Sequence, residues 1–219
     1  MNENGGIVKG VIFDVDGVLL DSMKIWNNAG ERYLIKQGIT PEPHLGDIMF
    51  SMTLSEGAQY LIDRYHVAAP FEDIKKGIMA EVEHFYFEEA KMKDGARELL
   101  DRLKEAGVRM SVATSTDRYC IEGAFSHLGI MDYFDVILTC SEVGKSKENP
   151  DIFFEAVSVM KTPIEYTWLF EDGLYSMKTA KREGFRVVGV YDSVSEKDQE
   201  EIRRIADVYL TRLEDFKLV

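Results

Sequence analysis

Two aspartates stand two positions apart directly after the first apolar segment of the chain. The segment Val8–Phe13 is short, apolar and β-branched, which predicts a buried strand of a parallel sheet, and Asp14 and Asp16 follow it. In extended chain, positions two apart point to the same side, so these two carboxylates can converge while Val15 faces away. Close carboxylates repel each other and need a cation or a shared proton, and one of them can act as a nucleophile.

Polar residues also follow the later strands that the sequence predicts. Thr114–Thr116 offers hydroxyl groups and N–H donors before a helix, Lys145 and Lys147 follow the next strand, and Glu171 and Asp172 follow the one after. Several carboxylates suit a hard cation such as Mg²⁺, whereas hydroxyls, N–H groups and a lysine suit a phosphoryl group. Each group alone is commonly a turn, a helix cap or a solvated surface residue. Together, at successive strand ends, they predict a site for phosphoryl transfer.

The elements that must position these residues alternate between strand and helix from about Asp94 onward. Apolar runs predict strands at Val108–Ala113, Asp135–Thr139, Thr167–Phe170, Arg186–Tyr191 and Val208–Thr211. Helical periodicity predicts helices at Ala96–Glu105, Arg118–Leu128, Asp151–Met160, Tyr175–Glu183 and Ser195–Ile205, the third capped by Asn149 before Pro150. This alternation indicates a parallel sheet with helices on both faces, and ligands of such sheets bind beyond the carboxyl ends of the strands.

The segment between the first strand and this alternating region has helical rather than strand periodicity. Helices are expected at Met23–Lys36, from a capping box at Thr53–Glu56 to about Tyr65, and at Phe71–Ala90. We therefore expect an α/β core domain formed by residues 1–21 and 92–219, interrupted by a helical cap domain at residues 22–91.

The composition of the chain argues against two classes of partner, nucleic acids and membranes. The chain has 219 residues, enough to bury a core, and 26 Lys and Arg against 39 Asp and Glu give a formal net charge of −13. Nucleic acids and anionic membranes favour basic proteins, so neither is an expected partner. The sequence shows no signal peptide and no apolar run long enough to span a bilayer, and its two cysteines are isolated. These features predict a reduced, cytoplasmic protein. The sequence does not give the oligomeric state, and its features are compatible with a monomer.

Four segments carry a family resemblance that covers essentially the whole chain. They are VIFDVDGVLLDS at the first strand, ATST at residues 113–116, GKSKENPDIF around the lysine pair, and FEDGLYSMKTAKREG near residue 171. In this order they resemble the haloacid dehalogenase (HAD) superfamily, most closely its β-phosphoglucomutase-like branch. The resemblance implies a Rossmann-like parallel sheet core with an inserted all-helical cap domain.

The resemblance also implies a role for each motif residue. Asp14 would be the nucleophile that forms an aspartyl-phosphate, and Asp16 would be the general acid and then the general base. Thr114 and the Ser115 N–H would bind the phosphoryl oxygens. Lys147 would neutralise the phosphoryl charge and orient Asp14.

A Mg²⁺ cofactor is the second implication of the resemblance. Its ligands would be the Asp14 carboxylate, the Asp16 carbonyl oxygen and the Asp172 carboxylate, with Glu171 binding directly or through water. The cap would begin at a hinge around residues 21–22.

Two positions depart from the family pattern. Glu148 replaces the usual proline after the motif lysine and adds a negative charge, and Gly173 replaces the usual serine and removes a hydroxyl. Lys145 stays open as a substitute for Lys147.

These observations predict a Mg²⁺-dependent phosphatase that hydrolyses a small phosphorylated metabolite, whose identity the sequence does not give. One alternative is a phosphosugar mutase, although the histidine expected early in the first cap helix of family mutases is Trp26 here. Another is a non-catalytic module that binds a phospho-ligand or Mg²⁺. Met23 and Trp26 either contact substrate or pack inside the cap, because cap helices close over such sites.

Overall fold

The computed structural model describes residues 7–218, which divide into two compact units. One unit contains the described residues up to Asp21 and those from Lys91 onward. The other is the continuous segment Ser22–Ala90, inserted between these two parts.

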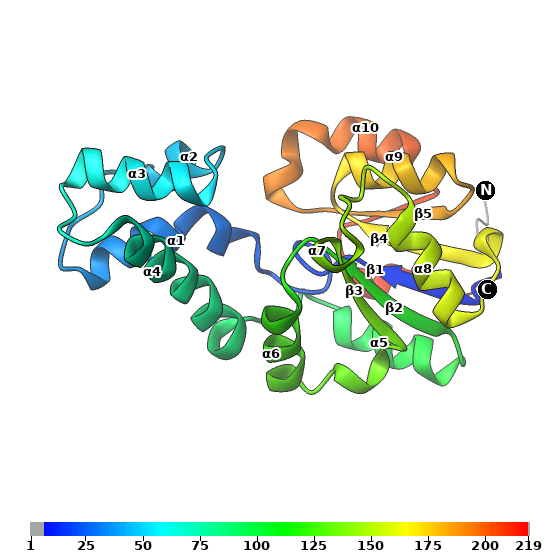
Figure 1. Cartoon of the computed structure of the whole chain (residues 1–219). Helices are drawn as coiled ribbons and strands as arrows, with labels where there is room; N and C mark the ends of the chain where they lie inside the picture. The colour runs from blue at the N-terminus through cyan, green and yellow to red at the C-terminus, as the bar shows by residue number, and fades with distance from the viewer. Residues whose placement is uncertain (1–6, 219) are drawn as a thin grey trace. The chain divides into compact units, whose positions relative to one another are not determined.

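The first unit is built on a six-stranded sheet in which every strand pairing is parallel (Figure 1). Its strand order is β3-β2-β1-β4-β5-β6. The strands are β1 (Gly10–Phe13), β2 (Arg109–Thr114), β3 (Val136–Thr139), β4 (Thr167–Glu171), β5 (Arg186–Val190) and β6 (Val208–Leu210). They start or end one or two residues from their predicted positions.

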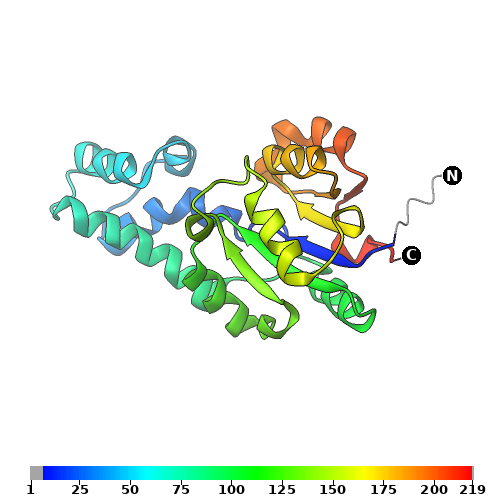
Figure 2. The ribbon, with the colours of Figure 1, turned by 45° about the vertical axis from the view of Figure 1, so that its right-hand side comes forward.

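Helices cover both faces of this sheet, with α8, α9 and α10 on one face and α5 and α6 on the other (Figures 1 and 2). Their bounds are α5 (Ala96–Glu105), α6 (Arg118–Leu128), α7 (Cys140–Val143), α8 (Asp151–Met160), α9 (Leu174–Arg182) and α10 (Gln199–Ile205). Side chains alternate along β1: Ile12 packs in the core beneath α8 and α9, whereas Phe13 contacts Phe134 and Phe170. Burial on both faces explains why the strand sequences are almost continuously apolar.

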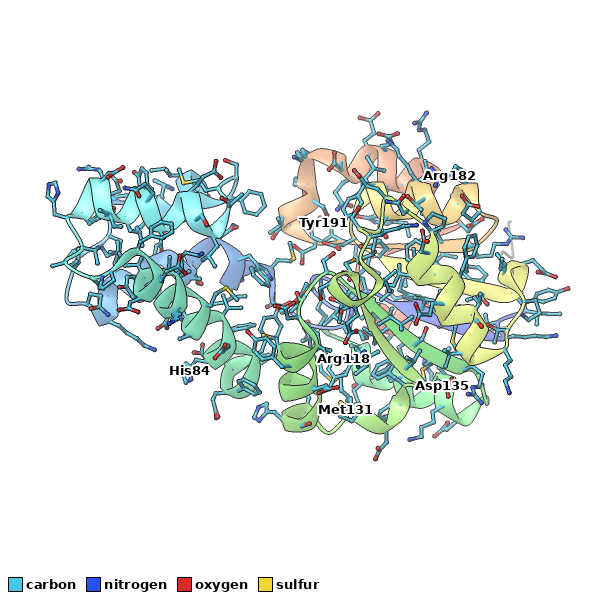
Figure 3. All side chains as sticks on the ribbon, viewed as in Figure 1. His84, Arg118, Met131, Asp135, Arg182 and Tyr191 are labelled. Carbon is cyan, nitrogen blue, oxygen red and sulfur yellow. The ribbon has the colours of Figure 1, made fainter. Side chains whose placement is uncertain are left out.

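The topology places the carboxyl end of β1 at a switch point. After β1 the chain adds β2 and β3 on one side, then crosses to add β4, β5 and β6 on the other. The strand polarity can be followed in Figure 3, where Arg118 lies beyond the end of β2 and Asp135 lies just before β3. Side chains that follow β1, β2 and β4 therefore meet at one edge, in the position where open α/β sheets bind ligands.

The inserted unit contains no strand among its residues, all of which the structure describes. Its helices are α1 (Met23–Lys36), α2 (Leu45–Met49), α3 (Leu54–Tyr65) and α4 (Phe71–His84), followed by a π-helix at Phe85–Glu89. Thr53 and Glu56 form the predicted capping box, with the Thr53 N–H donating to Glu56 Oε2 at 2.7 Å and the Glu56 N–H donating to Thr53 Oγ1 at 3.2 Å. The predicted fold class, a parallel α/β core with an all-helical insertion, is confirmed.

The helix α8 starts at Asp151 as predicted, but its N-cap residue differs from the prediction. Pro150 occupies the N-cap position and makes no side-chain cap, whereas the sequence predicted Asn149 there. The Asn149 N–H instead donates to the Ser146 carbonyl at 3.0 Å, closing a tight turn before the helix. This turn contains Lys147, so a local capping preference has given way to the placement of that side chain.

Two other predicted helices change character along their length. The predicted helix Phe71–Ala90 is α-helical only to His84, and its last turn is a π-helix in which the Ala90 N–H donates to the Phe85 carbonyl. The predicted helix Ser195–Ile205 becomes a 3₁₀ segment, Ser193–Asp198, and then α10. No helix within residues 7–218 is long and apolar enough to cross a membrane.

Candidate active site

Three carboxylates meet at the switch point. Asp14 continues β1, and its N–H donates to the Phe170 carbonyl of β4 at 3.0 Å. Glu171 ends β4 and Asp172 follows it. One carboxylate oxygen from each of these three residues lies within 4.8 Å of the other two, and all three residues are buried. Such a cluster of hard oxygen donors fits a divalent cation of the Mg²⁺ type.

A buried lysine compensates part of this negative charge. Lys147 Nζ donates to Asp14 Oδ1 at 2.5 Å and to Glu171 Oε2 at 2.9 Å, and only 2% of its surface is exposed. Burial alone would lower the pKa of Lys147, but the negative charges of Asp14 and Glu171 hold that pKa well above its ordinary value. Lys147 is therefore a fixed positive charge beside Asp14.

One lysine cannot neutralise three carboxylates. Burial, together with the neighbouring charge of Glu171, raises the pKa of Asp14 to about 8 despite the opposing effect of Lys147. Burial and the charges of Glu171 and Asp14 also raise the pKa of Asp172 well above its ordinary value. The cluster is short of positive charge, and a bound cation would supply it.

Glu171 is held by hydrogen bonds on both of its oxygens. The Gly173 N–H donates to Oε1 at 3.0 Å, and Ser176 Oγ donates to Oε2 at 2.7 Å. The serine hydroxyl that Gly173 lacks is thus supplied near Glu171 by Ser176, a position at which the HAD motif that the segment FEDGLYSMKTAKREG resembles has a glycine. Sequence reasoning gave Ser176 no role, although its departure from the motif was the available signal.

Asp16 lies on a tight turn beside this cluster. Thr116 Oγ1 donates to Asp16 Oδ2 at 2.6 Å, and the Thr116 N–H donates to Thr114 Oγ1 at 3.1 Å. Gly17 has a φ of 80°, which permits the sharp turn after Asp16. The ends of β1 and β2 are therefore linked through Thr116, a residue that the sequence analysis placed in the Thr-Ser-Thr motif without giving it a separate role.

The predicted phosphate-binding residues line the end of β2. Thr114 is buried at the last position of the strand, whereas Ser115 is exposed and its Oγ lies 3.5 Å from Cys140 Sγ. Tyr175 is 46% exposed and shares a hydrogen bond with Ser115, and partial desolvation of its hydroxyl raises the pKa of this phenol to about 12. Tyr175 thus remains a neutral hydroxyl near Ser115, and sequence reasoning did not find it.

The second candidate lysine lies elsewhere. Lys145 Nζ pairs with Asp151 Oδ1 at 2.6 Å at the exposed start of α8. Glu148 is also exposed, and its carbonyl accepts a hydrogen bond from Thr179 Oγ1. Of the two lysines, Lys147 is the one in contact with Asp14.

The two candidate cap residues both belong to α1. Met23 is half-buried, and Trp26 is 39% exposed with its ring centroid 6.4 Å from that of Tyr86. Trp26 also lines an apolar pocket of about 250 Å³ within the helical unit. Trp26 is therefore a partly exposed wall of this pocket.

A family model that covers most of the chain shows its family. A family model described as haloacid dehalogenase-like hydrolase matches residues 11–190. The chain belongs to this family, and its solved relatives place it in the β-phosphoglucomutase-like branch that the motifs predicted.

Individual relatives align along nearly their full length. A phosphorylated carbohydrates phosphatase from Thermotoga maritima is 27% identical over 193 residues, which cover 86% of this chain and 88% of that protein. A validoxylamine A 7'-phosphate phosphatase from Streptomyces hygroscopicus subsp. limoneus is 29% identical over 186 residues, 83% of this chain and 85% of that protein. The solved structure of a candidate β-phosphoglucomutase from Thermotoga maritima has a TM-score of 0.84 and 26% identity, covering 95% of this chain and 96% of that one. The expected class, a HAD-family hydrolase of phosphoric monoesters, is confirmed.

Replacing the buried lysine should cost both stability and activity. Lys147→Met leaves the Asp14 and Glu171 carboxylates buried without their cation, which we expect to lower the free energy of unfolding by about 3 kcal/mol. Hydrolysis of an aryl phosphate should fall by at least about 100-fold, because a charge that stabilises the phosphoryl group is lost. Urea denaturation and steady-state kinetics measure the two effects.

Lys145→Met is the matched control, since it removes an exposed lysine two positions away. Its unfolding free energy should stay within about 0.5 kcal/mol of wild type. Equal effects of the two substitutions would show that burial beside Asp14 confers no special role on Lys147.

Proposed function

We propose that this protein is a Mg²⁺-dependent phosphatase that hydrolyses a small phosphorylated metabolite through an aspartyl-phosphate at Asp14. The observation that supports it best is the buried cluster in which Lys147 contacts both Asp14 and Glu171 while Asp172 completes a set of three carboxylates. A nucleophile, a fixed positive charge and a set of metal ligands thereby share one sheet edge.

In the first step an Asp14 carboxylate oxygen attacks the phosphorus atom of the ester. A bond forms between this oxygen and phosphorus while the bond from phosphorus to the leaving oxygen breaks. Lys147 orients Asp14 through the 2.5 Å contact and offsets negative charge at the attacking group. Asp16, positioned by Thr116, donates a proton to the leaving oxygen.

In the second step water attacks the phosphorus atom of the aspartyl-phosphate. Asp16, now ionised, accepts a proton from this water, and the bond between phosphorus and Asp14 breaks to release inorganic phosphate. Asp14 and Asp16 return to their starting states. The Thr114 hydroxyl and the N–H of Ser115 hold the phosphoryl oxygens through both steps.

The donor set fits the proposed cation. Asp14 and Asp172 would hold Mg²⁺ together with the Asp16 carbonyl oxygen, and Glu171 would bind directly or through water. When bound, Mg²⁺ supplies positive charge that favours the ionised form of Asp14 and offsets charge on the phosphoryl group.

A phosphorylated carbohydrate is the substrate class that we propose. Support comes from the named activities of the relatives, two of which are phosphatases. A phosphosugar mutase is the second candidate, supported by the structural similarity to a candidate β-phosphoglucomutase.

The two aspartates should be separable by their kinetics. Asp14→Asn removes the attacking carboxylate and should abolish turnover. Asp16→Asn keeps the shape but cannot donate a proton, so it should slow alkyl phosphates more than aryl phosphates, whose leaving groups need little protonation. Single-turnover measurements of phosphoryl transfer test this, and equal losses with both leaving groups would argue against Asp16 as the acid.

Mg²⁺ should stabilise the protein more strongly as pH rises. Without a cation the folded chain holds a proton on Asp14 up to about pH 8, whereas the unfolded chain releases it near the ordinary pKa of 3.8. The free energy of unfolding of the metal-free protein therefore decreases as pH rises from the lower to the higher of these two pKa values. Mg²⁺ displaces the proton from Asp14 and restores the lost stability. Thermal unfolding with Mg²⁺ or with chelator should show a gain that is larger at pH 8 than at pH 6, with sodium chloride at equal ionic strength as the control.

A gain in melting temperature that is independent of pH would contradict this coupling. Turnover that survives thorough chelation would contradict the Mg²⁺ dependence itself.

Hydrolysis should prevail over isomerisation. The position of the mutase histidine is occupied by Trp26, whose indole donates a hydrogen bond but has no basic nitrogen to accept a proton from a sugar hydroxyl. Water should therefore win the competition for the phosphoenzyme. The test is incubation with β-glucose 1-phosphate and a trace of glucose 1,6-bisphosphate, with the products followed by phosphorus NMR. We expect inorganic phosphate, released from this ester or from another one offered in its place, and no glucose 6-phosphate. Glucose 6-phosphate accumulating faster than phosphate would support the mutase instead.

A further inference from the structure

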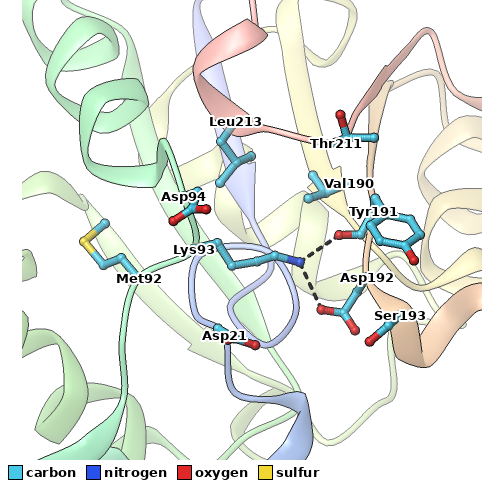
Figure 4. Close-up of a pocket in the computed structure, with 10 residues that line it drawn as sticks. All are labelled: Asp21, Met92, Lys93, Asp94, Val190, Tyr191, Asp192, Ser193, Thr211 and Leu213. Carbon is cyan, nitrogen blue, oxygen red and sulfur yellow. Dashed lines mark hydrogen bonds and ion pairs between the residues drawn. The ribbon is translucent and has the colours of Figure 1, made fainter.

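A lysine outside the motifs contacts the turn that carries Asp16. Lys93 Nζ donates to the Gly17 carbonyl at 2.7 Å, to the Tyr191 carbonyl at 2.7 Å and to Asp192 Oδ2 at 3.0 Å. An ammonium group has three N–H donors, and these three acceptors use all of them. Figure 4 shows Lys93 extended across a pocket of about 270 Å³ in the α/β unit, with its contacts to Tyr191 and Asp192 dashed.

Lys93 also joins this turn through its backbone. Its N–H donates to the Leu19 carbonyl at 2.9 Å, and the Asp21 N–H donates to the Lys91 carbonyl at 3.0 Å. Leu20 and Met92 form an antiparallel bridge between these two bonds. The segment that returns from the helical insertion is thereby paired with the segment that leads into it.

Asp192, which accepts a hydrogen bond from Lys93, is itself held by a second hydrogen bond. Asp192 follows β5 and is buried, and its Oδ1 accepts a hydrogen bond from the Val194 N–H at 3.0 Å. The Lys93 side chain is 17% exposed, so its ion pair with Asp192 is largely shielded from water. The ammonium group therefore connects the turn after β1 to Tyr191 and Asp192, which follow β5.

We propose that Lys93 is a positioning residue, which holds the turn after Asp16 so that the Asp16 carboxylate stays aligned for proton transfer. This inference rests on the function proposed above. Gly17 is the residue next to Asp16, and its N–H donates to the Leu20 carbonyl at 3.0 Å, so the turn is closed at its base by backbone bonds. Lys93 holds the outer carbonyl of the same turn, while Thr116 holds the Asp16 side chain.

Loss of this contact should act on proton transfer rather than on phosphate binding. Without the ammonium group the Gly17 carbonyl loses its partner and the Asp16 backbone gains freedom, whereas Asp14 and Lys147 keep their own contacts. A small misalignment of a catalytic group is enough to slow the step that depends on it. The penalty should therefore grow with the basicity of the leaving oxygen.

The experiment compares wild type, Lys93→Met and Lys91→Met on an aryl and an alkyl phosphate in single-turnover measurements with Mg²⁺. Lys93→Met keeps an unbranched side chain that is one atom shorter and removes its charge, and Lys91→Met makes the same change at an exposed position two residues away. With Lys93→Met we expect the alkyl ester to lose about tenfold more rate than the aryl ester, with KM changed by less than about threefold. Lys91→Met should match wild type with both esters.

A merely structural role would reduce the active fraction equally for both esters, so equal losses overturn the inference. Should Lys93→Met not fold, Asp192→Asn decides, because it retains an oxygen for the Val194 N–H while removing the charge that pairs with Lys93. Asp192→Asn should also slow the alkyl ester more than the aryl ester, by a smaller factor than Lys93→Met. A ratio of the two rates that equals that of wild type would overturn the inference. Wild-type protein that hydrolyses neither ester would contradict the proposed function, and the inference would fall with it.

Discussion

The contact between the Lys147 ammonium group and the Asp14 carboxylate is the interaction on which the rest of the site depends. A carboxylate buried at the end of a central strand is unstable as an anion unless positive charge lies beside it. Lys147 provides one such charge and is shared with Glu171. The remaining negative charge of Glu171 and Asp172 makes the cluster a candidate cation site. The proposed nucleophile, the lysine and the proposed metal ligands are thus parts of one charge balance.

The fold creates this balance by its topology. β1 lies between β2 and β4, so the residues that follow these strands converge although more than a hundred and fifty positions separate Asp14 from Glu171. Other groups within the motif segments then hold two of these residues: Ser176 and the Gly173 N–H hold Glu171, and Thr116 holds Asp16. Most of the precision of the site therefore comes from hydrogen bonds between loops rather than from the strands themselves.

The sequence was sufficient to predict the architecture because its signals are strong and local. Apolar β-branched runs specify buried parallel strands, and the Thr53–Glu56 capping box specifies the start of α3. Local rules failed where a tertiary contact outweighed them. Asn149 is a favourable N-cap residue, yet the turn that buries Lys147 moves the cap to Pro150.

The supporting residues of the site were harder to predict for a different reason. Ser176, Tyr175 and Lys93 are ordinary surface residue types when read along the chain. Their contacts with Glu171, Ser115 and Gly17 join segments that are distant in sequence, apart from the short step from Glu171 to Ser176. Periodicity and spacing carry no information about the contacts of Tyr175 and Lys93, so only the three-dimensional arrangement identifies them, whereas the departure of Ser176 from the motif was a signal in the sequence.

The central claim is that Asp14 becomes covalently phosphorylated during turnover. The most direct measurement is to quench the enzyme with acid while it turns over a phosphate ester, reduce it with borohydride, and sequence its peptides by mass spectrometry. Borohydride converts an acyl phosphate to an alcohol, so we predict homoserine at position 14 and unmodified aspartate at position 16, with no homoserine in Asp14→Asn. Rapid turnover with no homoserine at position 14, or with the modification at another carboxylate, would contradict it.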